Sequence, residues 1–244
     1  MQALIKMKDV SFIAHNNLIV RNFSYNFEEG KTTVLVGPSG SGKSTVLKLC
    51  AGVLVPSSGT VFFRDKDIFI MPRNENLAFR RDGAMVFQDS ALWANQTLYQ
   101  NLELPLNVHF PKMSRREREN RIHSVLKDVG YRRDLSIRPS QLSIGEQKLI
   151  AFARAMICRP TLLFLDEWTE SLDDSSAQRL ISLVRRYQAE NHTVILVSHD
   201  FRIIKNLADY IVMILEGQFF LQFTKQQITE DEELALYVRN GIES

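Results

Sequence analysis

The second half of the chain alternates short apolar runs with segments of helical periodicity. The apolar or β-branched runs are Leu162–Leu165, Thr193–Val197 and Tyr210–Leu215. The segments expected as helices cover residues 145–158, 174–190, 201–207 and 226–239, with a further strand at 218–223. Short continuous apolar runs predict buried strands. Strands that alternate with helices predict a mainly parallel sheet covered on both faces. The pattern therefore indicates an α/β fold.

The first third of the chain reads mainly as strands. Residues 3–28 follow a rough period of two on either side of a turn at Ala14–Asn17, which predicts two consecutive strands. Further strands are expected at Thr32–Val36, Thr60–Phe63 and Ala84–Phe87. Residues 64–82 are polar and show little periodicity, so no element is predicted there.

The composition changes between Asp89 and Gln141, where helix-forming residues predominate and β-branched runs are scarce. Within this segment, residues 114–130 predict a helix. Ser114 and Glu117 have the spacing of a capping box, and Gly130 is a residue type that commonly ends a helix. The basic residues of this helix are interleaved with acidic ones, which is typical of a solvated face.

Composition and charge narrow the class of protein. The 244 residues are 45% hydrophobic and 24% charged, as in an ordinary globular protein. A net charge of +2 gives no reason to expect nucleic-acid binding. No apolar run reaches the roughly 18 residues of a membrane helix, and the N-terminus lacks the apolar core of a signal peptide. We therefore expect the chain to stay in the cytosol.

The segment Gly37–Thr45 has the sequence of a phosphate-binding loop, G-x-x-x-x-G-K-[ST]. It follows the expected strand at 32–36 and precedes an expected helix at 46–51, which is the context that this motif requires. Glycines let the backbone approach a ligand closely, and a helix N-terminus attracts anions. Lys43 is expected to reach the β- and γ-phosphates, and Ser44 to hold Mg²⁺. The segment therefore predicts nucleotide binding.

A pair of acids, Asp166 and Glu167, follows the apolar run at 162–165. Phosphoryl transfer needs a carboxylate that supports Mg²⁺ and a base that orients the attacking water. Asp166 fits the first requirement and Glu167 the second. Because the pair lies downstream of a phosphate-binding loop in an α/β chain, we interpret it as part of the same site.

Four further motifs occur in a fixed order around these two. They are Gln88 at a strand end, Leu142–Gln147 before a helix, Ser171–Asp173 after the acidic pair, and Ser198–Asp200 after the next strand. No one of them suffices alone. Together with the phosphate-binding loop and the acidic pair, they resemble the nucleotide-binding domain of ABC transporters, over essentially the whole chain.

The resemblance implies the fold of the phosphate-loop NTPases in its ABC ATPase form. A single domain, residues 1–244, is expected. Residues 1–88 and 142–244 would form a mainly parallel core sheet with an N-terminal antiparallel β subdomain, and residues 89–141 an inserted α-helical subdomain. ATP and Mg²⁺ are the implied cofactors.

The resemblance also implies a role for each motif residue. The expected phosphate cradle consists of Gly37, Pro38, Ser39, Gly40, Ser41, Gly42, Lys43, Ser44 and Thr45. The metal is expected on Ser44, Gln88 and Asp166. The catalytic set is Glu167 as general base, His199 at the γ-phosphate, Gln88 as sensor of Mg²⁺ and water, and Lys43.

Two chains are implied to share each site. Ser143 and Gly145 of one copy are expected to cap the γ-phosphate of ATP that is held by a second nucleotide-binding subunit, most simply an identical one. Ser143 would begin a helix, where backbone donors attract an anion. Asp173 is expected at the interface between the copies, as the cap of the helix that starts at 174, or as both.

The sequence departs from the family pattern at several positions. Ile144 and Glu146 stand where the signature Leu-Ser-Gly-Gly-Gln has glycine and glutamine. Two interpretations are open: these residues weaken the two-chain site and slow hydrolysis, or their side chains point away from it. Trp168 replaces a proline and is expected to pack in the core or the dimer interface. The adenine-stacking aromatic is missing near Ala14, which leaves Phe12 or His15.

The first functional hypothesis is an ATPase subunit of an ABC transporter, bound to separate permease subunits on the cytoplasmic face of the membrane. The apolar stretch from Ala91 to Leu102 is expected either to border the permease-binding groove or to form local core. The sequences Phe87–Trp93 and Asn101–Leu106 are most similar to lipid-handling ATPases of the Mce/Mla type, with amino-acid and other importers next. The alternatives are a non-transport ABC ATPase and a weakly hydrolysing subunit that pairs with an active one.

Overall fold

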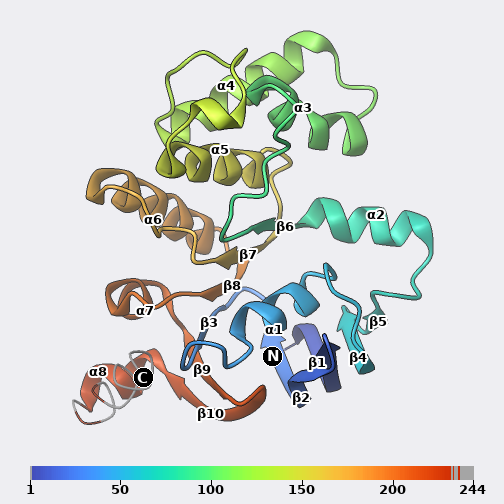
Figure 1. Ribbon diagram of the computed structural model, residues 1–244, viewed down its shortest axis with the longest axis vertical. Coiled ribbons are helices and arrows are strands. Elements are labelled where there is room, and N and C mark those ends of the chain that lie inside the picture. Colours follow the sequence, from blue (N-terminus) through green and yellow to red (C-terminus); the bar gives the residue numbers. More distant parts are fainter. Residues whose placement is uncertain (1, 232, 234–235, 237–244) are drawn as a thin grey trace.

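The computed structural model describes residues 2–231, 233 and 236, which are arranged around two sheets (Figure 1). The larger sheet has six strands in the order β10-β9-β3-β8-β7-β6. Their bounds are β3 Thr32–Val36, β6 Gly83–Val86, β7 Leu162–Asp166, β8 Thr193–Val197, β9 Tyr210–Leu215 and β10 Gln218–Thr224. All neighbouring pairs are parallel except β9 with β10. The predicted mainly parallel sheet is confirmed.

Alternate residues of the central strands face two different cores. On β3, Val34 and Val36 belong to the core that is shared with the helices α3–α8, whereas Leu35 belongs to the core that is shared with α1 and the smaller sheet. Every residue of β3, β7 and β8 is buried. Because both faces of these strands are covered, continuous apolar runs identify them in the sequence.

The smaller sheet is antiparallel and has the order β2-β1-β4-β5. Its long strands are β1 Ala3–Ala14 and β2 Asn17–Glu28, with β4 Ser58–Phe63 and the two-residue β5 Lys66–Asp67. The turn between β1 and β2 consists of His15 and Asn16, both with positive φ. This arrangement confirms the predicted N-terminal antiparallel β unit.

Three helices lie in the region between β5 and the signature motif. They are α2 Arg73–Asp82, α3 Leu98–His109 and α4 Arg115–Val129. The structure confirms the predicted helix at 114–130, including the capping box of Ser114 with Glu117 and the left-handed Gly130 at its end. Within 64–82, where the sequence pattern predicts no element, the structure has both β5 and α2. Only Phe79 of α2 is buried, so the helix shows almost no apolar stripe.

The remaining helices follow the predicted order: α1 Lys43–Cys50, α5 Ile144–Met156, α6 Asp174–Ala189, α7 Phe201–Leu207 and α8 Lys225–Glu230. The helix expected at 226–239 coincides with α8 up to Glu230, and most of its remainder lies outside the described residues. In the described part of the chain, no helix is both long and apolar enough to cross a membrane. The exact limits of the helical subdomain, residues 89–141, remain a prediction.

Trp168 is the largest fully buried side chain of the described residues. Its ring stacks on that of Phe152 from α5, with 5.6 Å between the ring centroids. The side chain therefore joins the loop after β7 to the helix that begins at the signature motif. Of the two predicted surroundings for Trp168, the structure supports the core.

We predict that Trp168→Ala lowers the free energy of unfolding by about 3–5 kcal/mol, because it removes buried contacts and leaves a cavity. Urea unfolding followed by circular dichroism measures the change. Trp93, which is 55% exposed, offers a matched control. Trp93→Ala should change the free energy by no more than about 0.5 kcal/mol. Equal losses in the two variants would contradict the assignment of Trp168 to the core.

Candidate functional site

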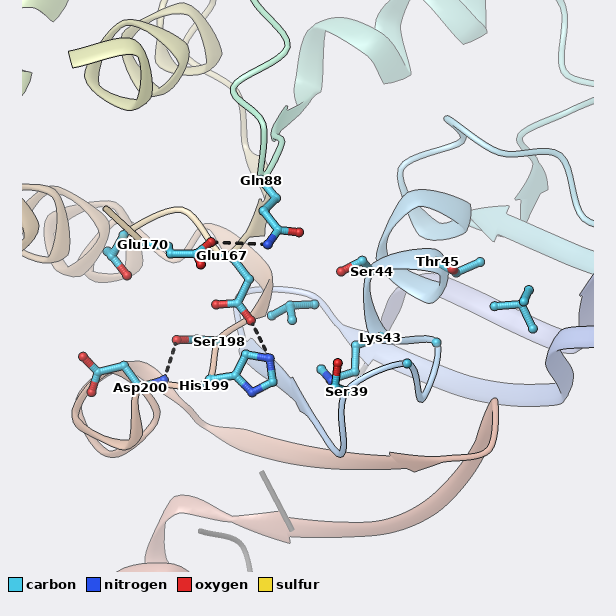
Figure 2. Close-up of a pocket in the computed structure, with 15 residues that line it drawn as sticks. Ser39, Lys43, Ser44, Thr45, Gln88, Glu167, Glu170, Ser198, His199 and Asp200 are labelled. Atoms are coloured by element: carbon cyan, nitrogen blue, oxygen red, sulfur yellow. Dashed lines mark hydrogen bonds and ion pairs between the residues drawn. The ribbon is translucent and has the colours of Figure 1, made fainter. Parts of the chain in front are cut away.

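A cavity of about 710 Å³ lies at the carboxyl ends of the parallel strands (Figure 2). Its walls come from the loop between β3 and α1, the ends of β6, β7 and β8, and Ile19 of β2. Loops at this edge of an open α/β sheet are the usual place for a ligand. The expected residues that line the cavity are Ser39, Gly40, Gly42, Lys43, Ser44, Thr45, Gln88, Glu167 and His199.

The loop before α1 is held by the turn between β9 and β10. Gly217 donates its backbone N–H to Ser41 O at 3.1 Å and accepts from Arg21 N at 2.9 Å. Gly37 has a φ of 145°, and a Cβ there would lie 2.1 Å from Ile214 O. Gly37, Pro38 and Ser41 do not line the cavity. These three residues were expected to contact the phosphates. In the structure they instead make contacts within the loop or with the β9–β10 hairpin.

The start of α1 presents backbone donors to this cavity. Gly42 occupies the N-cap position in a left-handed conformation, with no side-chain cap on the helix. The first N–H groups of a helix have no partner within it and carry partial positive charge. Lys43 lies beside them, with Nζ 2.8 Å from Gly37 O and 2.7 Å from Pro38 O. Burial lowers the pKa of Lys43, and the carboxylates of Glu167 and Asp166 oppose this shift.

Asp166 joins the end of β7 to the first turn of α1. Its Oδ1 accepts a hydrogen bond of 2.7 Å from Ser44 Oγ. Its Oδ2 is buried and has no partner among the described residues. Burial raises the pKa of Asp166, while the bond from Ser44 lowers it. A serine hydroxyl and a carboxylate with a free oxygen are the hard donors that Mg²⁺ prefers, so the residues fit this metal.

Glu167 follows in a left-handed backbone conformation, with a φ of 42°. Such a conformation is uncommon for a residue with a Cβ and is found at functional sites. The carboxylate Oε1 lies 3.0 Å from His199 Nε2 (Figure 2). Burial raises the pKa of Glu167 to about 7, against the opposing effect of the His199 backbone N–H. A carboxylate that titrates near pH 7 is suited to general base catalysis.

Lys148 is a site residue that sequence reasoning missed. It lies on α5 and is 2% exposed, and its Nζ donates to the backbone oxygen of Glu167 at 2.5 Å. Burial lowers its pKa, and the nearby Glu170, Glu167, Asp166 and Asp89 oppose this. A lone lysine in a helical segment carries no sequence signal of such a contact.

The polar wall opposite the phosphate-binding loop is built around Gln88 and Glu170. Gln88 Nε2 donates to Glu170 Oε2 at 3.3 Å (Figure 2). Ser198 and Asp200 of the motif around His199 also line the cavity, as does Thr169, which belongs to none of the motifs. Neither Phe12 nor His15 lines the cavity, whereas Ile19 does. Ile19 of β2 is therefore the residue that the antiparallel β subdomain contributes to the cavity wall.

The signature motif lines a separate cavity of about 510 Å³, with Ser171–Asp173 on its other side. Ser143 caps α5, and its hydroxyl accepts from Glu146 N at 3.2 Å. A Cβ on Gly145 would lie 2.9 Å from Ser171 O, so this glycine lets α5 approach the loop. Ser143 and Gly145 do not line the first cavity of their own chain.

Two residues for which more than one interpretation is open, Ile144 and Asp173, line this second cavity. Ile144 is the first helical residue of α5 and is 65% exposed, without positive φ. Its exposed side chain lines the signature cavity, and its backbone conformation is not strained. Asp173 caps α6 and accepts from Ser176 N at 3.0 Å, which confirms its capping role.

Comparison with known proteins identifies the family of this chain. The sequence matches the ABC transporter family over residues 20–170. It is 32% identical to the intermembrane phospholipid transport system ATP-binding protein MlaF of Haemophilus influenzae, over 96% of this chain and 88% of that protein. It is 30% identical to the methionine import ATP-binding protein MetN of Mannheimia succiniciproducens, over 96% of this chain and 68% of that protein.

A solved structure has the same fold. It is the dimeric post-hydrolysis state of the ATP-binding cassette MJ0796 bound to ADP and Pi, 28% identical, with a TM-score of 0.83. The match covers 91% of this chain and 98% of that one. This chain therefore belongs to the ABC transporter family and is one of its ATP-binding, ATP-hydrolysing subunits.

Proposed function

We propose that this subunit closes with a second copy around ATP and hydrolyses it with Glu167 as the general base, to drive transport through separate permease subunits. The observation that carries this proposal is the position of the Glu167 carboxylate. It lies in the same cavity as the phosphate-binding loop, in contact with His199, and burial brings its pKa to about 7.

The phosphates of ATP would lie on the backbone donors of the loop and the first turn of α1. Lys43 would reach the β- and γ-phosphates from its place beside these donors. Mg²⁺ would be held by Ser44 and supported by Asp166, with Gln88 at the far wall. When bound, the metal would neutralise charge on the transferred phosphoryl group.

Glu167 would accept a proton from the water that attacks the γ-phosphate. The left-handed backbone at this residue directs its carboxylate into the cavity, and Lys148 holds its carbonyl oxygen. His199 lies on the other side of the carboxylate, where it can donate to it or to the γ-phosphate. The loose transition state requires mainly positioning and charge stabilisation, which this arrangement of fixed groups provides.

A second copy would complete the site. Ser143 and Gly145 lie in the other cavity, beside Ser171–Asp173, and the segment 167–176 separates the two cavities. One chain therefore offers two half-sites, which an antiparallel pair of chains would join. The dimeric state of the similar cassette MJ0796 supports this arrangement, and we propose a homodimer.

A groove of about 360 Å³ is our candidate for the permease contact. Its apolar lining includes the exposed side chains Val53, Leu104 and Val108. Arg80 and Arg154 also line it, and each donates to backbone carbonyls. An apolar helix with an acidic side chain fits such a groove. The expected stretch Ala91–Leu102 does not line it, and its Leu98 and Leu102 are buried core residues.

We further propose lipids as the transported class and the cytoplasmic membrane face as the location. The support is the similarity to a phospholipid transport ATP-binding protein over nearly the whole of both chains. The methionine importers of similar identity make amino acids the competing class. Mass spectrometry of the purified complex with its permease tests this. Co-purified phospholipid would support the proposal, and its absence beside bound amino acid would overturn it.

We predict that Glu167→Gln lowers the ATPase rate at least about 100-fold, because the amide cannot accept the proton. ATP binding should be retained, and the trapped nucleotide should hold the chain as a dimer. A phosphate-release assay and size-exclusion chromatography measure these effects. The same substitution at Glu170, which contacts Gln88, should cost less than about tenfold. Equal rates for wild type and Glu167→Gln would exclude the base assignment.

The pH dependence of hydrolysis should follow the ionisation of Glu167. Its raised pKa of about 7 means that much of the carboxyl is protonated, and inactive as a base, below pH 7. The value of kcat/KM should therefore rise with pH, with a midpoint near 7, and level off above it. The residual rate of Glu167→Gln should lack this limb. A wild-type profile that is flat between pH 5.5 and 8.5, spanning about 1.5 units on either side of that pKa, would contradict the proposed titration.

The groove can be tested by introducing a charge. Val108→Asp should reduce co-purification of the permease from membranes about tenfold or more, because a carboxylate would be desolvated in an apolar contact. The ATPase rate of the isolated subunit should not change. Ile70, which is 81% exposed and outside the groove, provides the control Ile70→Asp. If both variants retain the permease equally, this groove is not the contact.

A further inference from the structure

Glu146 places a carboxylate where the signature motif is expected to meet a phosphate. Its Oε2 accepts from Ser143 N at 2.9 Å and from Ser143 Oγ at 3.0 Å, so the acid and the serine close a capping box. The capping box satisfies donors of the helix, but it also brings one negative charge to the start of α5. An incoming γ-phosphate would be repelled by that charge unless another group compensates for it.

Arg133 provides this compensation. Its Nη1 donates to both carboxylate oxygens of Glu146, at 2.8 Å and 3.1 Å. The arginine comes from the loop after α4, whose Tyr131 is 6% exposed and anchors the loop in the core. The bond from Arg133 is the largest cause that lowers the pKa of Glu146, followed by the donors of Ser143. Glu146 is therefore ionised and paired at neutral pH.

The pair controls both the charge and the geometry of the signature. With Arg133 present, the start of α5 has no net side-chain charge and keeps the partial positive charge of its backbone. Glu146 lines the signature cavity together with Ile144 and Gly145, and the guanidinium draws its carboxylate toward the loop 131–135. Without Arg133, the Glu146 carboxylate would have no counter-ion. It would still lie within hydrogen-bond distance of the Ser143 hydroxyl, which is expected to receive the phosphate.

We propose that Arg133 is a positioning residue of the two-chain ATP site, which neutralises and orients Glu146 so that Ser143 can receive the γ-phosphate held by a second copy. This inference rests on the proposed function, because it assigns a role in the shared site. It also explains how the chain tolerates an acid in the signature: the arginine 13 positions earlier is its counter-ion.

The test measures dimer formation with a non-hydrolysable ATP analogue and Mg²⁺, by sedimentation velocity at low salt. Arg133→Ala should raise the analogue concentration for half-maximal dimer about fivefold to tenfold. The matched control is Arg132→Ala, which removes the same charge from the neighbouring residue, since the donors to the Glu146 carboxylate among the described residues are Arg133 and Ser143. Its dimer should form as in wild type. The deficit of Arg133→Ala should shrink in 0.5 M salt, where the screening length is only about 4 Å.

Rescue separates an electrostatic role from a merely structural one. Glu146→Gln keeps an acceptor for Ser143 and removes the charge, so the double variant Arg133→Ala/Glu146→Gln should regain wild-type dimer formation within about twofold. A double variant as weak as Arg133→Ala, or an Arg133→Ala that matches Arg132→Ala, would overturn the role of Arg133 alone. Nucleotide binding without dimer in every chain, wild type included, would instead overturn the shared site, and this role with it.

Discussion

The hydrogen bond between Ser44 and Asp166 is the contact around which the site is organised. It joins the first turn of α1, the helix that follows β3, to the end of β7. In the sheet, β3 and β7 are separated by β8. A parallel sheet brings the carboxyl ends of its strands to one edge, so this bond is possible only if β3, β8 and β7 keep their order and register. The buried core on both faces of these strands therefore fixes the distance between the loop and the acidic pair.

That geometry has an electrostatic cost. Asp166 and Glu167 are adjacent carboxyls in a buried environment, and burial raises the pKa of both. The charges of Lys43 and Lys148 oppose the raised pKa of Asp166, and burial lowers the pKa of each lysine. Buried charges are tolerated when they are paired or hydrogen-bonded. In all four groups, burial thus disfavours the charged form. The phosphates of a ligand would pair with the lysines, and a divalent cation would pair with the carboxylates.

The parts of this fold that are buried on both sides were predictable from sequence, because burial imposes apolar runs such as those of β7 and β8. Helix α2 was not predictable, since only Phe79 is buried in it and its existence depends on packing beside β6. The phosphate-binding loop and the acidic pair were predictable from their own sequence patterns, whereas the roles of Gln88, Ser143, Gly145 and His199 came from the family resemblance. Ile19 and Lys148 were missed because their positions depend on tertiary contacts with the loop and with Glu167. The Arg133–Glu146 pair likewise joins residues whose spacing forms no motif.

Helix α5 connects the two halves of the chemistry within one chain. Its N-terminus carries Ser143 and Gly145, and one turn later Lys148 holds the carbonyl of Glu167. The segment from Glu167 to Asp173 is a second connection between the two cavities. It lines the first cavity at one end and the signature cavity at the other. If a contact displaced the first turn of α5, Lys148 would move with it, because the helix is rigid. The contact that we propose between a second copy and Ser143 would therefore be linked mechanically to the position of Glu167 in this copy.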